Sequence, residues 1–349
     1  MIARRLTAFA GAVLAAVALA ASPAAARGHD DVQAAFDSTF GTELRAPQSY
    51  ETLYASNLEA RIADLANPAR GRIGVAAIDL TTGEEVMVLG DQLFPMASTS
   101  KVAVAAAYLE MVDRGQASLT SEYALLLPVA SPKFSSAKAP VRPGNYMPAI
   151  DLIEIMITRS SNPATDSLLA AVGGPGTVNS WMRRHGFNDF SLNRDIATLV
   201  RDDGEYDPAT RIDPRDAATP RTMARFLQGL YRGDFLSPSS RQVLLGAMSR
   251  TITGKRRIPA LMPYEARVSH KTGSLNNTSS DIGIIETPDG RVIAVAIYVT
   301  GQGTRAARED KIAEIARAIY DGFAARAQSN PLSNPNRTWT SAPYGAGGR

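Results

Sequence analysis

Ser98 and Lys101 are the residues whose types and spacing best suit chemistry. They are three positions apart in Ser98-Thr99-Ser100-Lys101, at the start of an apolar stretch, and this spacing would place both on one face of a helix. A serine hydroxyl needs a base to become a nucleophile, and a lysine whose pKa is lowered by burial can accept the proton. The amino end of the helix would add N–H donors for an oxyanion. The alternative is an ordinary capping serine with a solvated lysine, because this spacing often arises by chance.

Two further polar clusters extend this hypothesis. Lys271 precedes Thr272-Gly273-Ser274 on an expected strand, where the lysine could hold a carboxylate and the Ser274 N–H could complete an oxyanion hole. Because side chains alternate along a strand, His270 should then point away from the site. Ser160-Ser161-Asn162 follows an apolar helix over 151–158 and presents hydroxyl and amide groups from a short loop. The alternatives are a surface lysine before a turn and a helix cap at Asn162.

Taken in order, the three motifs resemble those of the penicillin-recognising serine enzymes, and of class A β-lactamases in particular. They read Ser-x-x-Lys at 98–101, Ser-Ser-Asn at 160–162 and Lys-Thr-Gly at 271–273, and the resemblance extends from about residue 49 to 327. It implies an exported serine hydrolase that opens the β-lactam ring of penicillins and cephalosporins. Such β-lactam catabolism would confer antibiotic resistance. The implied fold is α/β, of the β-lactamase/transpeptidase type, with an antiparallel five-stranded sheet flanked by helices and an inserted all-helical domain.

The resemblance also implies a role for each motif residue. Ser98 would attack the lactam carbonyl, with Lys101 as proton acceptor or as part of a relay through water and a loop carboxylate. Ser160 would pass a proton to the leaving nitrogen, and Lys271 would lower the pKa of Ser160 and hold the substrate carboxylate. The backbone N–H groups of Ser98 and Ser274 would hold the oxyanion, and Asn162 would bind the amide of the acyl side chain. The implied substrate-binding residues are Asn162, Thr272, Ser274 and Arg257.

The acidic segment 187–218 looks like the loop that carries the deacylating carboxylate of the family. Counting back from Asp216 without gaps puts Arg201 where the family has the arginine that pairs with this aspartate, so we expect an ion pair between them. The same count puts Asp203 at the catalytic glutamate and leaves Glu205 as an alternative. Aspartate is one methylene shorter, so deacylation would be slow unless the loop moves inward.

Arg257 is the candidate for meeting the substrate carboxylate. It lies fourteen residues before Lys271, in a region where some members of the family carry such an arginine. The planar guanidinium suits a carboxylate because it donates two parallel hydrogen bonds. The alternative is a solvated basic cluster over 255–257. Phe134 is either an aromatic wall of the cleft or a loop residue that packs on its own domain.

Hydrophobic periodicity indicates the elements that must position these residues. Alternating residues predict strands at 72–80, 84–89, 268–272, 281–286 and 291–300, and helical spacing predicts helices at 49–65 and 305–327. The stretch 98–114 is apolar on nearly every face, which predicts a fully buried helix. The catalytic domain should therefore span 27–327, with an α/β part at about 45–92 and 258–327 and a helical part at about 93–257.

Composition excludes several classes of function. The chain has 349 residues, 45% of them hydrophobic, so disorder is not its main state. A formal charge of +3 is no footprint for nucleic acid, and the absence of cysteine excludes thiolate catalysis and disulfides. Three histidines do not favour a histidine-rich metal centre, and neither a metal nor an organic cofactor is implied.

The N-terminal segment of the sequence indicates export. Residues 1–26 have the basic start, short apolar core and small-residue cleavage site of a signal peptide, with cleavage expected after Ala26. The mature chain should be periplasmic or secreted, without stable membrane insertion, and monomeric; a retained N-terminal anchor is the alternative. The tail 328–349 reads as disordered.

Two other functions share most of these residues. One is a serine peptidase or esterase that acts on cell-wall substrates and turns β-lactams over weakly. The other is a non-enzymatic protein that binds muropeptides or β-lactams in the same pocket. The first differs from a β-lactamase mainly in not requiring a competent loop carboxylate.

Overall fold

A five-stranded antiparallel sheet built from both ends of the described chain forms the centre of the fold. The computed structural model describes residues 57–329, so the expected signal peptide and most of the expected tail lie outside it. The strand order is β2-β1-β10-β9-β8. The strands are β1 (Ile73–Asp79), β2 (Glu85–Val88), β8 (Arg267–Leu275), β9 (Thr278–Glu286) and β10 (Val292–Thr300). The strands expected from alternation are confirmed.

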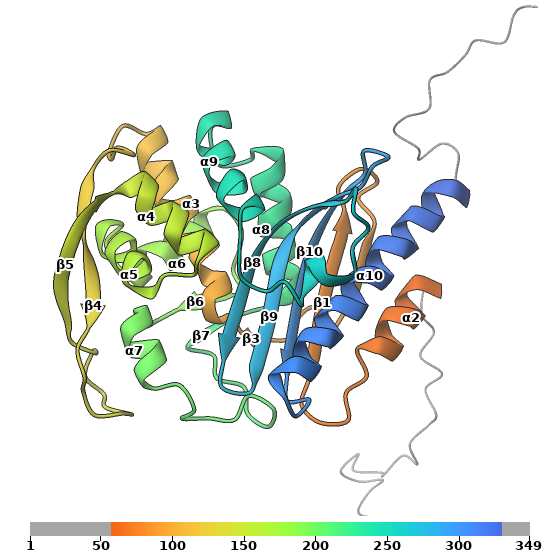
Figure 1. The fold of residues 1–349 in the computed structure, drawn as a ribbon, viewed down its shortest axis with the longest axis horizontal. Helices are drawn as coiled ribbons and strands as arrows, with labels where there is room; N and C mark the ends of the chain where they lie inside the picture. The colour runs from red at the N-terminus through yellow and green to blue at the C-terminus, as the bar shows by residue number, and fades with distance from the viewer. Residues whose placement is uncertain (1–56, 330–349) are drawn as a thin grey trace, which may run out of the picture. The chain divides into compact units, whose positions relative to one another are not determined.

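Both faces of this sheet are covered, because alternate residues of each strand join two different cores. In β10, Ile293, Val295 and Ile297 pack with the helices α2 (Asn57–Leu65) and α10 (Arg305–Ser329). Ala294 and Ala296, between them, belong to the larger core on the other face, where α8 (Pro220–Arg232) packs on β1 and β10. Figure 1 shows α2 and α10 side by side along one face of the sheet, with the remaining helices beyond the other.

The middle of the chain supplies the helices. The short 3₁₀ helix η1 (Ala97–Ser100) runs directly into α3 (Lys101–Asp113), in which every residue from Lys101 to Glu110 is buried, as the apolar pattern predicts. Around α3 lie α4 (Ala149–Thr158), α5 (Asn162–Ala171), α6 (Pro175–Arg184) and α9 (Pro238–Ser249). Three of the helices in this part have a side-chain cap and a proline at their first or second position. Ser161 caps α5, Thr219 caps α8 and Ser237 caps α9.

Four features of the chain between β2 and β8 were not expected from the sequence. A hairpin pairs β4 (Glu122–Pro128) with β5 (Val141–Pro148) at the edge of this part of the molecule. A small sheet joins β3 (Phe94–Pro95), β7 (Asp216–Ala218) and β6 (Phe190–Leu192), and the acidic segment holds the helix α7 (Ile196–Arg201). A second 3₁₀ helix, η2 (Ile258–Leu261), precedes β8. No described helix has the length and apolar character that a membrane crossing needs.

Candidate active site

Lys101 begins α3 and connects the first two sequence motifs. Its side chain is fully buried, and Nζ donates to the carbonyl oxygen of Ser160 at 2.7 Å and to Asn162 Oδ1 at 2.7 Å. A longer bond of 3.2 Å joins Nζ to Ser160 Oγ. The lysine is therefore held by neutral oxygens, and no carboxylate contacts it among the described residues.

Ser160 Oγ lies between two lysines. Lys271 Nζ donates to it at 2.9 Å and to the carbonyl oxygen of Thr272 at 2.9 Å. Lys101 reaches the same hydroxyl from α3. The structure thus brings side chains of all three motifs together at one oxygen.

Burial sets the charge of both lysines. Desolvation lowers the pKa of Lys101 well below its usual value, the positive charge of Lys271 lowers it further, and Asp166 opposes these effects. Burial also lowers the pKa of Lys271 to about 7, against the attraction of Asp281 and with a smaller contribution from Arg257. Burial therefore favours the uncharged form of Lys101, which can accept a proton.

Ser98 lies in η1, one short turn before Lys101, and its side chain is half-buried. Its hydroxyl makes no hydrogen bond with any described residue. The preceding residue, Ala97, has φ of 49° and Ser160 has φ of 59°, both in the left-handed region that costs a non-glycine residue about 1–3 kcal/mol. Such strain is common where a turn must aim a reactive side chain.

Gly273 brings β8 close to the turn that carries Ser98. A Cβ atom built on Gly273 would lie 2.7 Å from the carbonyl oxygen of Met96 and 2.4 Å from Ser280 Oγ. Only a glycine permits this approach. The third motif therefore lies against the start of η1, on the same side as Lys271.

Asn162 does not cap α5, and its side chain binds Lys101 instead. Ser161, not Asn162, caps α5, accepting the Ala164 N–H at 3.3 Å. Asn162 Oδ1 is bound to Lys101, which leaves the amide NH2 group without an acceptor among the described residues. This group can therefore donate to a ligand.

Arg257 is buried, so the alternative of a solvated basic cluster does not apply to it. It is 1% exposed, and its guanidinium donates to Glu309 Oε1, to the carbonyl oxygens of Gly273 and Ser280, and to Ser274 Oγ at 2.6 Å. Ser274 itself is exposed at the end of β8. Arg257 thus lies directly behind Ser274, and a contact of its own with a substrate carboxylate stays a prediction.

The remaining residues of β8 are held by their neighbours. Thr272 Oγ1 is 2.7 Å from Thr253 Oγ1. His270 Nδ1 lies 2.9 Å from both oxygens of Asp281, which also accepts the Ile258 N–H, so His270 faces the core beside α10. The expectation that His270 points away from Lys271 is confirmed.

The predicted ion pair between Arg201 and Asp216 is wrong. Arg194 Nε lies 2.5 Å from Asp216 Oδ2, whereas Arg201 pairs with Asp202 at 2.8 Å. The reason is the register of the small sheet, in which Leu192 lies opposite Asp216 and places Arg194 next to it. The ungapped count failed because the arginine that pairs with Asp216 precedes α7, whereas Arg201 ends it.

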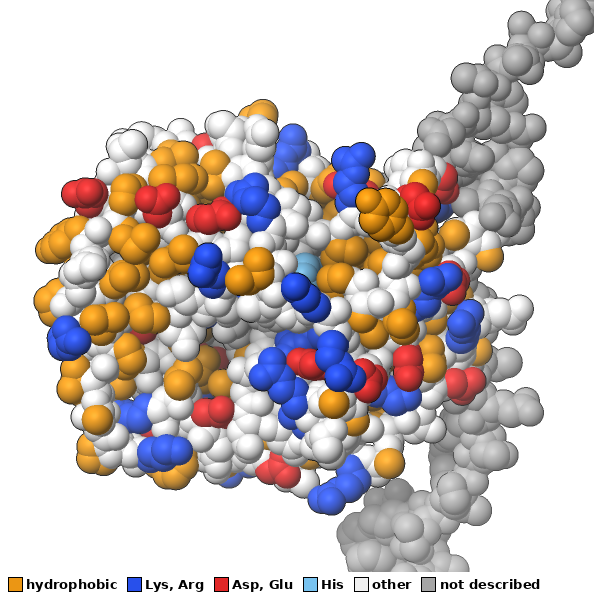
Figure 2. Space-filling view, in the orientation of Figure 1, with side chains coloured by type: hydrophobic (Ala, Val, Ile, Leu, Met, Phe, Trp, Pro, Cys, Tyr) orange, Lys and Arg blue, Asp and Glu red, His pale blue; other side chains and the backbone are white. Residues whose placement is uncertain are grey.

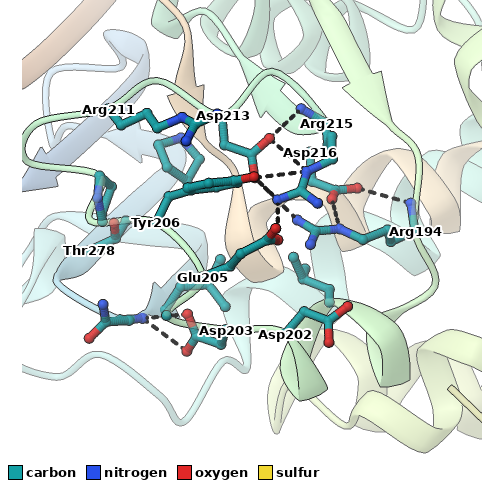
Figure 3. Close-up of a pocket in the computed structure, with 16 residues that line it drawn as sticks. Arg194, Asp202, Asp203, Glu205, Tyr206, Arg211, Asp213, Arg215, Asp216 and Thr278 are labelled. Atoms are coloured by element: carbon teal, nitrogen blue, oxygen red, sulfur yellow. Dashed lines mark hydrogen bonds and ion pairs between the residues drawn. The ribbon is translucent and has the colours of Figure 1, made fainter. Parts of the chain in front are cut away.

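The two loop carboxylates proposed for deacylation have other partners. Both oxygens of Asp203 accept the Asn276 N–H, each at 2.9 Å, in the turn between β8 and β9. Glu205 Oε2 lies 2.6 Å from Arg215 Nη2. Figure 3 shows this network, in which arginines and carboxylates of the loop face one another. Neither carboxylate contacts Lys101, Ser160 or Asn162.

Asp166 is the carboxylate whose charge raises the pKa of Lys101. The sequence motifs did not point to it. It lies four residues after Asn162 on α5, and its oxygens accept the N–H groups of Ile196 at 2.7 Å and Ala197 at 2.9 Å. Burial raises its pKa to about 6. The available signal was its position one helical turn after the motif. It fixes the start of α7 beside the site.

Phe134 does not form a buried wall. Its side chain is 54% exposed and its N–H donates to Asp202 Oδ1 at 2.8 Å.

No cluster of acidic or histidine residues suited to a metal ion occurs within residues 57–329. Figure 2 shows basic and acidic side chains mixed over the visible face, without a field of one sign.

Known proteins resemble this chain over most of its described length. The chain matches the model of a family described as the β-lactamase enzyme family over residues 57–323. It is 30% identical to the β-lactamase CTX-M-8 of Citrobacter amalonaticus over 275 residues, which cover 77% of this chain and 90% of that protein.

Two solved structures illustrate the range of similar folds. A variant of the class A β-lactamase of the last common ancestor of Gram-negative bacteria is 35% identical, with a TM-score of 0.66 over 78% of this chain and 100% of that one. A mutant of PBP-A, described as an acyl-enzyme complex with penicillin G, is 26% identical, with a TM-score of 0.66 over 77% and 97% of the two chains.

Proposed function

Because this chain belongs to the β-lactamase enzyme family and is a hydrolase of the serine β-lactamase type, we propose that it opens the β-lactam ring of penicillins and cephalosporins through an acyl-enzyme on Ser98. The observation that carries the proposal is the buried Lys101, one turn after Ser98 and held by neutral oxygens. A lysine whose burial favours the uncharged form is the kind of base that a serine nucleophile needs.

The acylation step uses the three motifs in sequence. Lys101 takes the proton of Ser98, directly or through water, and Ser98 Oγ forms a bond to the lactam carbonyl carbon. The backbone N–H groups of Ser98 and Ser274 stabilise the oxyanion. The ring C–N bond then breaks, and Ser160 gives its proton to the departing nitrogen. The proton of Ser160 is replaced from Lys101 or Lys271, which both donate to its hydroxyl.

Substrate binding is proposed for the residues around this centre. Lys271 and Ser274 would bind the substrate carboxylate, with Arg257 behind Ser274 holding that hydroxyl in place. Thr272, whose hydroxyl is bound to Thr253, would line the same wall. Asn162 would donate its free NH2 group to the amide carbonyl of the acyl side chain.

Deacylation needs a water molecule to attack the ester and release the ring-opened acid. Asp203 stays the proposed base for this step, yet it would first have to leave the Asn276 N–H. Its present position favours a second candidate function, a penicillin-binding peptidase or esterase on cell-wall substrates that releases β-lactams slowly. Both candidates share the Ser98 acyl-enzyme and differ in its lifetime.

A time course distinguishes the two candidates. Purified residues 27–349 are mixed with a chromogenic cephalosporin, beside Ser98→Ala and a matched exposed variant, Ser249→Ala, while intact mass spectra are recorded. Sustained turnover that requires Ser98 supports the β-lactamase, and a single burst with a lasting adduct supports the slow hydrolase. Absence of any adduct and any turnover in the unmodified chain would contradict both.

Export belongs to the same proposal. Residues 1–26 would direct the chain out of the cytoplasm and be removed after Ala26, leaving a periplasmic or secreted monomer. N-terminal sequencing of the protein recovered from periplasm or medium checks this cleavage. A recovered chain that still begins at Met1 would contradict it.

A further inference from the structure

A buried histidine and a buried aspartate lie behind the third motif, and the proposed mechanism uses neither. His270 and Asp281 are 3% and 0% exposed, on the neighbouring strands β8 and β9. His270 Nδ1 lies 2.9 Å from each carboxylate oxygen of Asp281, and Asp281 Oδ2 also accepts the Ile258 N–H at 3.2 Å. The register pairs Asp281 with Thr272, the residue after Lys271, so Asp281 is a diagonal neighbour of that lysine in the sheet.

The packing of β8 on β9 makes room for the imidazole. Gly283 is the residue opposite His270 in the register, and a Cβ atom built on it would lie 2.8 Å from His270 Cβ. Because the interior is tightly packed, a larger residue at this position would push the imidazole away from Asp281. The contact between the two side chains is therefore built into the sheet.

Charged groups from α10 and from the start of η2 also face this part of the sheet. Glu309 accepts hydrogen bonds from the guanidinium groups of Arg257 and Arg305. Arg308 donates to a serine hydroxyl, an asparagine amide oxygen and two backbone carbonyl oxygens. The carboxylate of Glu309 is thus paired with arginines, and these arginines form no ion pair with Asp281 among the described residues.

Asp281 has a histidine as its partner instead of a permanent cation. In the part of the chain that the structure describes, it pairs with His270 and with no lysine or arginine. A neutral imidazole that carries its proton on Nδ1 donates to the carboxylate and leaves the negative charge in place. An arginine at the same point would hold the carboxylate but would cancel its charge. The pair is therefore suited to fix a carboxylate that still acts on its surroundings.

Lys271 is the cation on which this carboxylate acts. Burial lowers the pKa of Lys271 to about 7, the charge of Asp281 raises it, and the charge of Arg257 lowers it. From α3, Lys101 shares a hydroxyl with Lys271, and after α9 Arg250 is paired with a glutamate of α4. Asp281 is the carboxylate whose charge favours the ammonium form of Lys271.

We propose that Asp281 is a positioning residue that acts through Lys271: its buried carboxylate, fixed by a neutral His270, keeps Lys271 an ammonium that can bind the substrate carboxylate. The inference rests on the proposed function, because it takes Lys271 to bind that carboxylate. It adds two residues that touch neither the substrate nor Ser98. Its consequence is that the charge of Asp281 raises the pH at which binding of an anionic substrate is lost.

The test is the pH dependence of acylation in Asp281→Asn, because asparagine keeps the shape and an accepting oxygen but not the charge. Residues 27–349 and this variant react with benzylpenicillin between pH 5 and 9, and the second-order acylation rate is measured by stopped flow. Without the carboxylate, Lys271 loses its proton at lower pH. We expect the alkaline fall to move about one pH unit lower, so that the rate is about tenfold lower at about pH 8 and nearly unchanged at about pH 5.5.

Two further variants separate the charge from a purely structural role. His270→Asn keeps a neutral N–H donor near the position of Nδ1, so its alkaline fall should stay in place, and a shift there would refute the role of His270. Asp79→Asn is the matched control, because Asp79 is equally buried in the same sheet but is paired with Arg291. It should lose stability and keep the shape of its pH profile. A loss in Asp281→Asn that is the same at every pH, or an equal shift in Asp79→Asn, would overturn the proposal.

A titration that needs no reaction separates this inference from the proposed function. Lysine labelled with carbon-13 at Cε reports the protonation of each side chain by NMR in Ser98→Ala, and the signal of Lys271 is the one that disappears when Lys271→Arg is added. If this signal titrates at lower pH in Asp281→Asn while Ser98 of the unmodified chain is never acylated, the role of the carboxylate stands and the acyl-enzyme fails. If Lys271 titrates at the same pH with and without the carboxylate, the inference fails.

Discussion

Two buried lysines that share one serine hydroxyl are the defining feature at the scale of single residues. Each would repel the other if both were charged, and burial already disfavours the charged form of each. For Lys101, desolvation is the main cause of the lowered pKa, the charge of Lys271 lowers it further, and Asp166 opposes both. In the proposed mechanism, Lys271 is the ammonium that attracts a carboxylate and Lys101 is the base.

This division of roles predicts how acylation depends on pH. The rate rises as Lys101 loses its proton and should fall as the pH passes about 7, where Lys271 loses the charge that binds the substrate carboxylate. Lys271→Arg should lower the rate but remove the alkaline fall, because arginine stays charged. Stopped-flow acylation by benzylpenicillin between pH 5 and 9 measures both profiles, and Lys255→Arg, at an exposed site, is the control. If the acylation rate of Lys271→Arg still falls above about pH 7, the fall is due to the titration of another group.

At the scale of elements, the loop between β6 and β7 is the part of the chain to which the proposed mechanism assigns deacylation. The strands, the buried helix and the proline-marked caps could be predicted from the sequence, because they depend on local periodicity and on capping chemistry. The partner of Asp216 could not be predicted, because the register of β6 with β7 is set by long-range pairing. The role of Asp166 could not be predicted either, since it binds the start of α7, a helix that the sequence did not indicate.

Ile196 offers a direct test of the idea that the loop lacks a carboxylate at the acyl group. It begins α7, lines a cavity beside Asn162, and its N–H is fixed by Asp166. Ile196→Glu should accelerate deacylation by about 10- to 100-fold, because a carboxylate there can activate water and nearby Asp166 would raise its pKa. The lifetime of the benzylpenicillin adduct, followed by mass, is the measurement. Val200→Glu, one turn later and half exposed, is the control, and equal acceleration in both variants would refute the positional argument.

The whole molecule assembles its site from three parts of the chain that are distant in sequence. Ser98 and Lys101 start the central helix, Ser160 and Asn162 follow α4, and Lys271 lies on the edge strand of a sheet made from both ends. The motifs alone could predict that these residues meet, because the resemblance supplies the arrangement. The contact that holds the sheet edge against η1, at Gly273, depends on packing that no local pattern encodes.

Gly273→Ala tests whether this contact sets the geometry of the site. The added Cβ atom would overlap the Met96 carbonyl oxygen and Ser280 Oγ, so β8 must move away from the turn that carries Ser98. We expect a loss of stability of about 1–3 kcal/mol and a larger loss in acylation rate, because the distance between Ser98 and Lys271 grows. Thermal unfolding and acylation by benzylpenicillin measure the two effects. Gly176→Ala, in α6 with open space around the position, should leave both nearly unchanged. If Gly273→Ala loses stability but acylates at the normal rate, the contact supports the fold without positioning the site.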